Sequence, residues 1–339
     1  MNKKVLQELA QLLKNSKNIV VVPHQNPDGD AMGSTLALNR FLNKTGHKST
    51  VIAPNDYPTF LKWLPASDDV ILFDSNTEDA SDLIAKADII FILDFNALHR
   101  TGDAMASVLE KSKATFVMID HHQQPEAISE FIYSDVSISS TSQMVYHFID
   151  KLNKLDIIDA AIATCLYTGI MTDTGSFKYN TTTSTTHRVV AALIDKGADN
   201  NAIHTQVYDN NSYHRVQLLG HVLETMKVLK QYNAAYMVLT EADKEKYNFK
   251  KGDSEGFVNY GLSIKGIKLA VIFIEDKVQS IVKMSFRSQG TFSVNDFSRA
   301  HFSGGGHINA AGGRSQDDIE TTVAKFLEVL PQYASELNS

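Results

Sequence analysis

The chain has 339 residues, 43% of them hydrophobic and 21% charged, with a formal net charge of −7 at pH 7. This composition is that of a globular protein rather than a disordered or fibrous one, and the length favours two domains over one. The acidic balance argues against a protein that tracks long nucleic acid, because such proteins usually present a basic groove. Small anionic ligands remain compatible, since they need only a local basic pocket.

The sequence carries no signal for a membrane or for secretion. No apolar run approaches the roughly 20 residues that cross a bilayer, and the N-terminal residues carry charges where a secretory signal would be apolar. The one cysteine, Cys165, excludes an intrachain disulfide, and its apolar surroundings indicate a small buried side chain rather than a reactive thiol. These features predict a cytoplasmic protein without a membrane partner.

The first half of the chain alternates short apolar runs with helical patterns. It opens on an amphipathic helix with Val5, Leu9 and Leu12 on one face. The apolar runs are hydrophobic on both faces, as in parallel strands covered by helices on both sides. They predict strands at residues 18–24, 48–53, 70–73, 89–94, 115–120 and 131–134. We therefore expect an α/β domain with a parallel sheet and helices on both faces.

The pattern changes in the second half. From residue 141 to about residue 230 it is mostly helical, with a last helix at 213–230, and no proline falls between Pro125 and Pro331. Beyond it, the periodicity predicts strands at 235–240, 268–275 and 279–288 and a closing helix at 318–337. We predict an N-terminal domain at residues 1–190, a semi-rigid helical linker at 191–230 and a smaller α+β domain at 231–339.

The strongest local motif follows the first predicted strand, where His24, Asp28 and Asp30 come just before a helical pattern. In an open α/β sheet, ligands bind outside the carboxyl ends of the strands. Imidazole together with carboxylate suits Mn²⁺, Co²⁺ or Zn²⁺ better than Mg²⁺ alone. The motif therefore predicts a metal site. The alternative is a polar loop in which Asp30 only caps the helix.

Two further strands also deliver titratable groups to the same edge of the sheet. One ends in Asp94, and the next ends in Asp120, followed by His121 and His122. A fourth carboxylate, Asp173, follows an apolar helical run. Asp94 alone would more often be a cap or turn residue, and Asp-His-His alone is weak evidence. Their shared placement is what favours one site built by several strands.

The second half adds a glycine-rich segment, Ser303–Gly312, in which His307 follows Gly304, Gly305 and Gly306. Glycines let backbone N–H groups approach an anion closely, so the segment is a candidate phosphate nest; a plain glycine-rich turn is the alternative. Arg100, shortly after Asp94, is placed to reach into the cleft, although a surface salt bridge would explain it as well.

Taken in order, these motifs resemble a known family. His-x-x-x-Asp-x-Asp at 24–30, Asp94, Asp-His-His at 120–122 and Asp-Thr-Gly at 173–175 resemble the four motifs of the DHH phosphoesterase superfamily. The glycine-rich segment resembles the signature of the DHH-associated C-terminal domain. The likeness spans nearly the whole chain and is greatest to the group of bifunctional oligoribonucleases (nano-RNases) and phosphatases of 3′-phosphoadenosine 5′-phosphate (pAp).

The resemblance implies two divalent metal ions, with Mn²⁺ the expected ion. It implies that His24 and Asp28 hold the first metal, that Asp30, His121 and Asp173 hold the second, and that Asp94 bridges both. It also implies that Asp120 orients His121 without binding a metal itself, and that His122 contacts the substrate as catalytic acid or phosphate ligand. In the C-terminal domain it implies that Arg287, Gly304, Gly305, Gly306 and His307 bind the substrate, although an exposed strand arginine would explain Arg287 equally well.

The implied activity is hydrolysis of very short oligoribonucleotides to 5′-mononucleotides, and of pAp to AMP, by a hydroxide that bridges the metals. A phosphodiesterase for cyclic dinucleotides or their linear products is the main alternative. An inorganic pyrophosphatase or polyphosphatase ranks lower, because it is not expected to carry the glycine-rich signature. A non-catalytic nucleotide sensor would need a broken metal ligand, and none is visible. The expected partners are short oligoribonucleotides or small nucleotides, with a homodimer left open.

Overall fold

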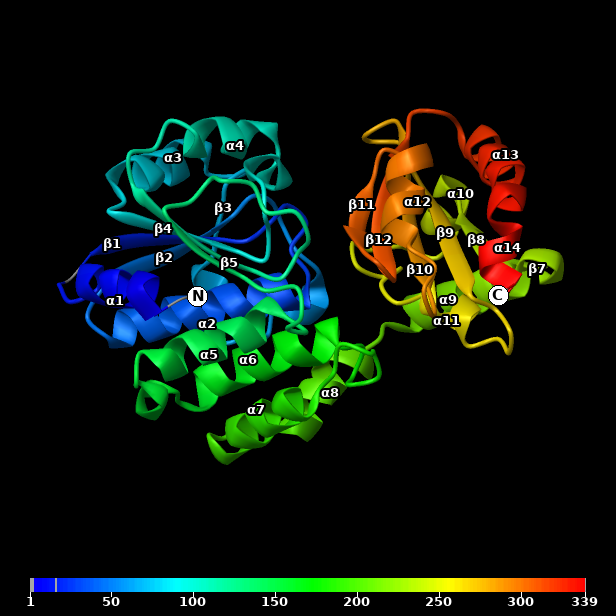
Figure 1. Ribbon diagram of the computed structural model, residues 1–339. Helices are drawn as coiled ribbons and strands as arrows, with labels where there is room; N and C mark the ends of the chain where they lie inside the picture. Colours follow the sequence, from blue (N-terminus) through cyan, green and yellow to red (C-terminus); the bar gives the residue numbers. More distant parts are fainter. Residues whose placement is uncertain (1–2, 16, 339) are drawn as a thin grey trace. The chain divides into compact units, whose positions relative to one another are not determined.

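The computed structural model describes residues 3–15 and 17–338 and divides into two compact units, residues 1–210 and 211–339 (Figure 1). The boundary falls inside the segment predicted as a linker, because the helix α8 (Asn200–Tyr208) belongs to the first unit and α9 (Tyr213–Thr225) to the second. No helix of the described residues combines the length and apolarity that a membrane span requires.

The first unit is built on a six-stranded sheet in the order β3-β2-β1-β4-β5-β6, and all its pairs are parallel. The six predicted strands are all present, as β1 (Asn18–Val22), β2 (Lys48–Ala53), β3 (Ile71–Leu72), β4 (Ile89–Leu93), β5 (Thr115–Asp120) and β6 (Phe131–Ser134). The chain runs outward from β1 to β3, then returns and runs the other way from β4 to β6. The strand order therefore reverses between β1 and β4, which is where such sheets bind ligands.

Helices cover both faces of this sheet, as predicted. Alternate strand residues divide between two apolar clusters, so that Val21 and Phe91 join one cluster and Val20 and Ile90 the other. The first face is covered by α2 (Gly29–Lys44), α5 (Thr141–Lys151), α6 (Ala160–Asp173) and α7 (Ser184–Asp195), with the N-terminal α1 (Lys3–Leu12) also packed there. The opposite face is covered by α3 (Thr77–Lys86) and α4 (Asp103–Leu109) (Figure 1).

The second unit has a mixed six-stranded sheet in the order β11-β12-β10-β9-β8-β7, in which only β8 and β9 pair in parallel. The predicted strands are confirmed as β8 (Ala234–Leu239), β9 (Leu269–Asp276) and β10 (Ile281–Ser288). The sequence reading missed β7 (Lys227–Leu229), β11 (Gly305–His307) and β12 (Ala310–Ser315), because β7 and β11 are short and both hairpin strands β11 and β12 are rich in glycine.

The helices of the second unit also differ in part from the prediction. The helix expected at 213–230 ends at Thr225, since the chain enters β7, and the closing helix is split into α13 (Ile319–Val329) and α14 (Ala334–Asn338) by a 3₁₀ turn containing Pro331. The remaining helices are α10 (Glu241–Lys246), α11 (Asn259–Leu262) and α12 (Val294–His301). One apolar cluster joins α12, α13 and α14 to the sheet, and a second joins α9 to the other face.

In the first unit, α2 and α6 cross at two glycines. A Cβ added at Gly33 would lie 2.5 Å from the Cys165 carbonyl oxygen and 2.9 Å from the Gly169 nitrogen, and one added at Gly169 would lie 2.7 Å from Asp30 Oδ1. Both obstacles at Gly33 are backbone atoms, which cannot move aside as a flexible side chain would. The two helices therefore depend on hydrogen at these positions to reach their packing distance.

We predict that Gly33→Ala lowers the free energy of unfolding of the first unit by about 1–3 kcal/mol, because overpacking forces the helices apart. Urea unfolding followed by the fluorescence of Trp63, the one tryptophan of the chain, measures this unit. The control is Gly220→Ala in α9, where an added Cβ meets no atom within 4 Å. That change should stabilise its helix by up to about 1 kcal/mol in circular dichroism. Equal effects of the two changes would contradict the packing argument.

Candidate functional site

The candidate site lies where the strand order reverses. His24 follows β1, Asp94 follows β4 directly, and Asp120 is the last residue of β5. Asp94 is buried and has a φ of 64°, in the left-handed region, while its N–H donates to the Ile119 carbonyl at 3.1 Å. That conformation costs a residue with a Cβ about 1–2 kcal/mol. Such strain gathers at functional positions, where the surrounding structure holds it in place.

One group of ligand atoms forms around His24. Its Nε2 lies 3.6 Å from Asp94 Oδ2 and 3.8 Å from Asp28 Oδ2, and its Nδ1 is 2.8 Å from the Gln25 carbonyl oxygen. The other oxygen of Asp28 caps α2 by accepting from the N–H groups of Asp30 and Ala31. The helix cap is therefore Asp28 and not Asp30, and Asp28 still keeps one oxygen turned towards His24.

A second group forms around His121. Its Nε2 lies 3.3 Å from Asp173 Oδ2, 3.4 Å from Asp94 Oδ1 and 3.9 Å from Asp30 Oδ2. Its Nδ1 is 3.2 Å from the Ile138 carbonyl oxygen, which orients the ring. Asp94 therefore turns one carboxylate oxygen to each histidine. The six residues that the sequence reading named as metal ligands are brought together within the first unit.

The start of α5 holds two of these carboxylates. Asp30 accepts hydrogen bonds from the backbone N–H groups of Thr141 at 2.6 Å and Ser142 at 2.9 Å, and the Thr141 hydroxyl donates to Asp94 at 2.9 Å. The N-terminus of a helix favours an anion through its free N–H groups and its dipole. Ser140 caps this helix by accepting from the Gln143 N–H. No sequence motif reveals the contacts of Thr141 and Ser142, because Asp30 and Asp94 lie far from them in the sequence.

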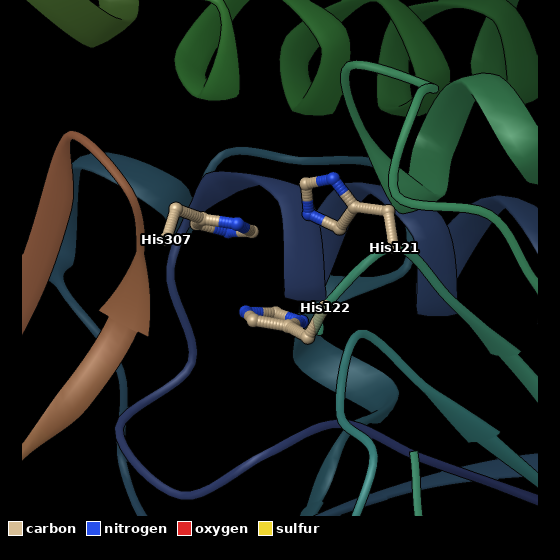
Figure 2. Close-up of side chains that lie close together, drawn as sticks. All are labelled: His121, His122 and His307. Carbon is tan, nitrogen blue, oxygen red and sulfur yellow. The ribbon is translucent and has the colours of Figure 1, made fainter. Parts of the chain in front are cut away.

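Asp120 pairs with a different histidine from the one predicted. Its Oδ1 lies 2.6 Å from Nδ1 of His122, and its Oδ2 accepts from the His122 backbone N–H at 3.0 Å. The structure thus pairs Asp120 with His122, whereas the resemblance implied that it orients His121. An aspartate readily accepts from the backbone two residues on, and that turn brings the His122 ring back to the carboxylate. The rings of His121 and His122 meet edge to face at 5.0 Å between centroids (Figure 2).

Burial is the largest influence on the ionisable groups of the site. It raises the pKa of Asp30 well above the ordinary value, and repulsion from Asp94 and Asp173 adds to the rise. Burial opposes the charged forms of Asp94 and His121 as well, but their mutual hydrogen bond and the neighbouring charges outweigh it. The pKa of Asp94 therefore lies well below its usual value and that of His121 well above. The carboxylates around His121 therefore favour its protonated form.

Divalent cations fit this arrangement. Ligand atoms of His24, Asp28 and Asp94 lie within 4.8 Å of one another, and so do those of Asp30, Asp94 and His121. The two sets share Asp94, and each combines imidazole with carboxylate, the donor types that suit Mn²⁺, Co²⁺ or Zn²⁺. A third set, Asp94, Asp120 and His122, meets the same distance limit, but the hydrogen bond to Asp120 already occupies Nδ1 of His122.

Arg100 lies at the edge of the His24 group. Its carbonyl accepts from the Gln25 N–H at 2.7 Å, and its positive charge is near enough to lower the pKa of His24. That effect is small beside burial, which also lowers this pKa, and beside the carboxylates Asp94 and Asp28, which raise it above the ordinary value overall. The guanidinium is therefore near enough to act on His24 electrostatically, and its role in a cleft stays a prediction.

The candidate binding residues of the second unit also come together within that unit. Arg287 on β10 and His307 on β11 are both cross-strand partners of Ala310, so the three residues form one row across the sheet. Gly305 and Gly306 lie in the hairpin strand β11, and Gly304 comes just before it. Packing accounts for Gly306, since an added Cβ would lie 2.5 Å from the Ala310 carbonyl oxygen, and its N–H donates to Asn295 at 2.9 Å. That N–H is therefore not available to an anion in this structure.

The fold and the motifs define a DHH-type phosphoesterase. The chain belongs to the DHH family: the family's N-terminal domain matches residues 18–170, and a DHHA1 domain matches residues 230–336.

Relatives support this assignment over most of the chain. It is 27% identical over 303 residues to the probable bifunctional oligoribonuclease and PAP phosphatase NrnA of Streptococcus mutans, covering 89% of this chain and 91% of the relative. It is 29% identical to the NrnA of Thermus thermophilus, covering 95% and 92%. The crystal structure of an exopolyphosphatase-related protein from Bacteroides fragilis is 40% identical, with a TM-score of 0.95 over 100% of this chain and 98% of that one.

The hydrogen bond from Thr141 to Asp94 predicts a role in cation affinity. We expect Thr141→Val, which keeps the shape and removes the hydroxyl, to weaken Mn²⁺ binding by about 10-fold or more, the usual cost of losing a group that orients a ligand. Isothermal titration calorimetry measures the affinity. Thr141→Ser keeps the hydroxyl and is the matched control. A valine variant that binds Mn²⁺ as tightly as the serine variant would show that this hydrogen bond does not matter.

Proposed function

We propose that the protein hydrolyses very short oligoribonucleotides to 5′-mononucleotides and pAp to AMP, with two divalent cations in the first unit. The observation that carries the proposal is the position of Asp94, between two groups that each combine a histidine with carboxylates. The relatives named as oligoribonuclease and PAP phosphatase, similar over about nine-tenths of the chain, support the choice of substrate.

In this proposal each cation has its own residues. His24 and Asp28 would hold the first, Asp30, His121 and Asp173 would hold the second, and Asp94, which faces both groups, would serve both. The mixed imidazole and carboxylate donors favour Mn²⁺. When bound, such cations lower the pKa of water and neutralise phosphoryl oxygens. Thr141 and the start of α5 fix the carboxylates of Asp94 and Asp30 in place.

His122 then acts on the substrate. Its Nδ1 is held by Asp120 at 2.6 Å, which fixes the orientation of the ring. In this role, Nε2 would donate to a phosphate oxygen or protonate the leaving oxygen. A positioned acid of this kind typically contributes about 10²–10⁴-fold in rate. The close contact of Asp120 with His122 supports this division of roles.

A comparison of substrates tests the proposal. With Mn²⁺, we expect the highest kcat/KM on pAp and on di- to pentaribonucleotides, and much lower values on a cyclic dinucleotide and on pyrophosphate. Chelation should abolish the activity, and Asp94→Ala should lower kcat by 10³-fold or more, because each cation supplies several kcal/mol and about 1.36 kcal/mol is tenfold. A preference for the cyclic dinucleotide would favour that alternative, and a preference for pyrophosphate would overturn the nucleotide assignment.

Substitutions of the two neighbouring histidines should have different effects on metal content and on catalysis. We expect His121→Ala to lose bound metal, because it removes a ligand beside Asp94 and Asp173. His122→Ala should keep nearly all its metal while kcat falls by about 10²–10⁴-fold. Elemental analysis of the purified variants gives the metal content, and circular dichroism checks the fold. Equal metal loss in both would show that the roles are divided wrongly.

The second unit supplies the candidate groups that recognise the nucleotide, Arg287, His307 and the glycines before it. We expect Arg287→Ala and His307→Ala to lower kcat/KM for pAp by about 10–150-fold, since a charge-assisted hydrogen bond is worth about 1.5–3 kcal/mol. Bis-p-nitrophenyl phosphate, a small activated diester without a nucleotide, should be hydrolysed almost normally. Parallel losses on both substrates, with a lower melting temperature, would indicate a structural role instead.

A further inference from the structure

One side of the second sheet is only half covered. On β10 and β12 the side chains alternate, so that Met284 and Phe286 join an apolar cluster on one face while the residues between them point to the other. On that other face, the cluster under α9 takes strand residues from β8 and β9, such as Met237 and Ile272. Among the described residues it takes none from β10 or β12. The apolar cluster therefore does not cover this part of the sheet, although α11 contacts β10.

This other face carries cations at its two ends and small residues between them. In register, Arg287 pairs with Ala310, Ser285 with Gly312, and Lys283 with Arg314. Gly312 is exposed, and an added Cβ there would meet only the Met284 carbonyl oxygen, at 3.8 Å. The middle row, Ser285 and Gly312, thus has only small side chains and lies between two basic rows.

Within the described part of the chain, two of the three cations of this face have no carboxylate partner. No carboxylate of the described residues lies within ion-pair distance of Arg287 or of Arg314, and Arg314 is exposed. Lys283 Nζ pairs with Asp276 Oδ2 at 2.7 Å, and its side chain is 42% exposed. Partly exposed pairs of this kind contribute about 0–1 kcal/mol, so a phosphate can compete for the lysine. A basic face on a chain with a net charge of −7 indicates an anionic ligand.

The spacing of the two rows selects the kind of ligand. Arg287 and Lys283 are four residues apart on one strand, which corresponds to about 13 Å. A single phosphate cannot contact both rows, because an ion pair needs nitrogen and oxygen within about 4 Å. A ligand that uses both rows must therefore carry a second anionic group farther along its chain. A single-stranded oligonucleotide has such groups and can lie across the middle row of small side chains.

We propose that Lys283 and Arg314 form a second phosphate-binding row that holds an outer phosphate of an oligoribonucleotide whose inner phosphate contacts Arg287. This rests on the proposed function and deepens it, since the second row makes binding depend on the number of nucleotides. The first row serves every substrate, whereas the second row serves only chains long enough to reach it.

The test measures binding to the full chain, with Asp94→Ala preventing turnover. Fluorescently labelled mono-, di-, tri- and tetraribonucleotides are titrated at several KCl concentrations, and anisotropy gives Kd. Adding Arg314→Ala should reduce the preference for the tetranucleotide over the mononucleotide by about tenfold, as expected for one lost charge-assisted contact. The dependence of log Kd on log salt should fall by about 0.7 for the tetranucleotide, the value for one phosphate on a single strand.

Two further variants sharpen the result. Lys265→Ala removes an exposed cation of the second unit that lies outside β10 and β12, and should leave the length preference as it was. Asp276→Asn frees Lys283 from its ion pair and should increase the preference for the tetranucleotide. If Arg314→Ala changes Kd equally for oligonucleotides of every length, or does not change it, the proposal of a second phosphate-binding row is wrong. That outcome is separate from the proposed function, which fails if the wild-type protein hydrolyses neither pAp nor oligoribonucleotides.

Discussion

The candidate site depends on the two-sided contact of Asp94. Its carboxylate faces His24 with one oxygen and His121 with the other, at 3.6 and 3.4 Å. This is possible because Asp94 follows a central strand at the point where the strand order reverses, and because its backbone takes a left-handed conformation there. The strain is held by the neighbouring strand, whose Ile119 carbonyl accepts the Asp94 N–H. The position of Asp94 in the sheet therefore determines that its carboxylate can face both histidines.

The core of the first unit is built tightly around this point. The glycines where α2 and α6 cross bring α6 close to Asp30, and the start of α5 donates two N–H groups to the same carboxylate. A carboxylate buried among other carboxylates would otherwise be costly. The helices therefore do more than cover the sheet, because their packing distance sets where the ligand oxygens lie.

Much of this could be predicted from the sequence, because the signals were local. Six apolar runs gave the strands of the first sheet, and carboxylates at three strand ends indicated one site. The features that the sequence did not predict are contacts between distant segments and strands with weak local patterns. Thr141 contacts Asp94 across 47 positions of sequence, which no motif reveals. The strands β11 and β12 escaped notice because glycine has a low strand propensity. The partner of Asp120 was misassigned because the turn after β5 decides between two adjacent histidines.

The turn after β5 affects how the Asp120–His122 pair responds when neighbouring segments of the site move. Asp120 and His122 are two residues apart, and both hydrogen bonds between them are made within one short segment at the end of β5. The catalytic pairs of many hydrolases join residues from separate segments and loosen when those segments shift. Here both hydrogen bonds that orient the imidazole lie within one segment. A movement of the loops around the candidate ligands would therefore leave this pair intact.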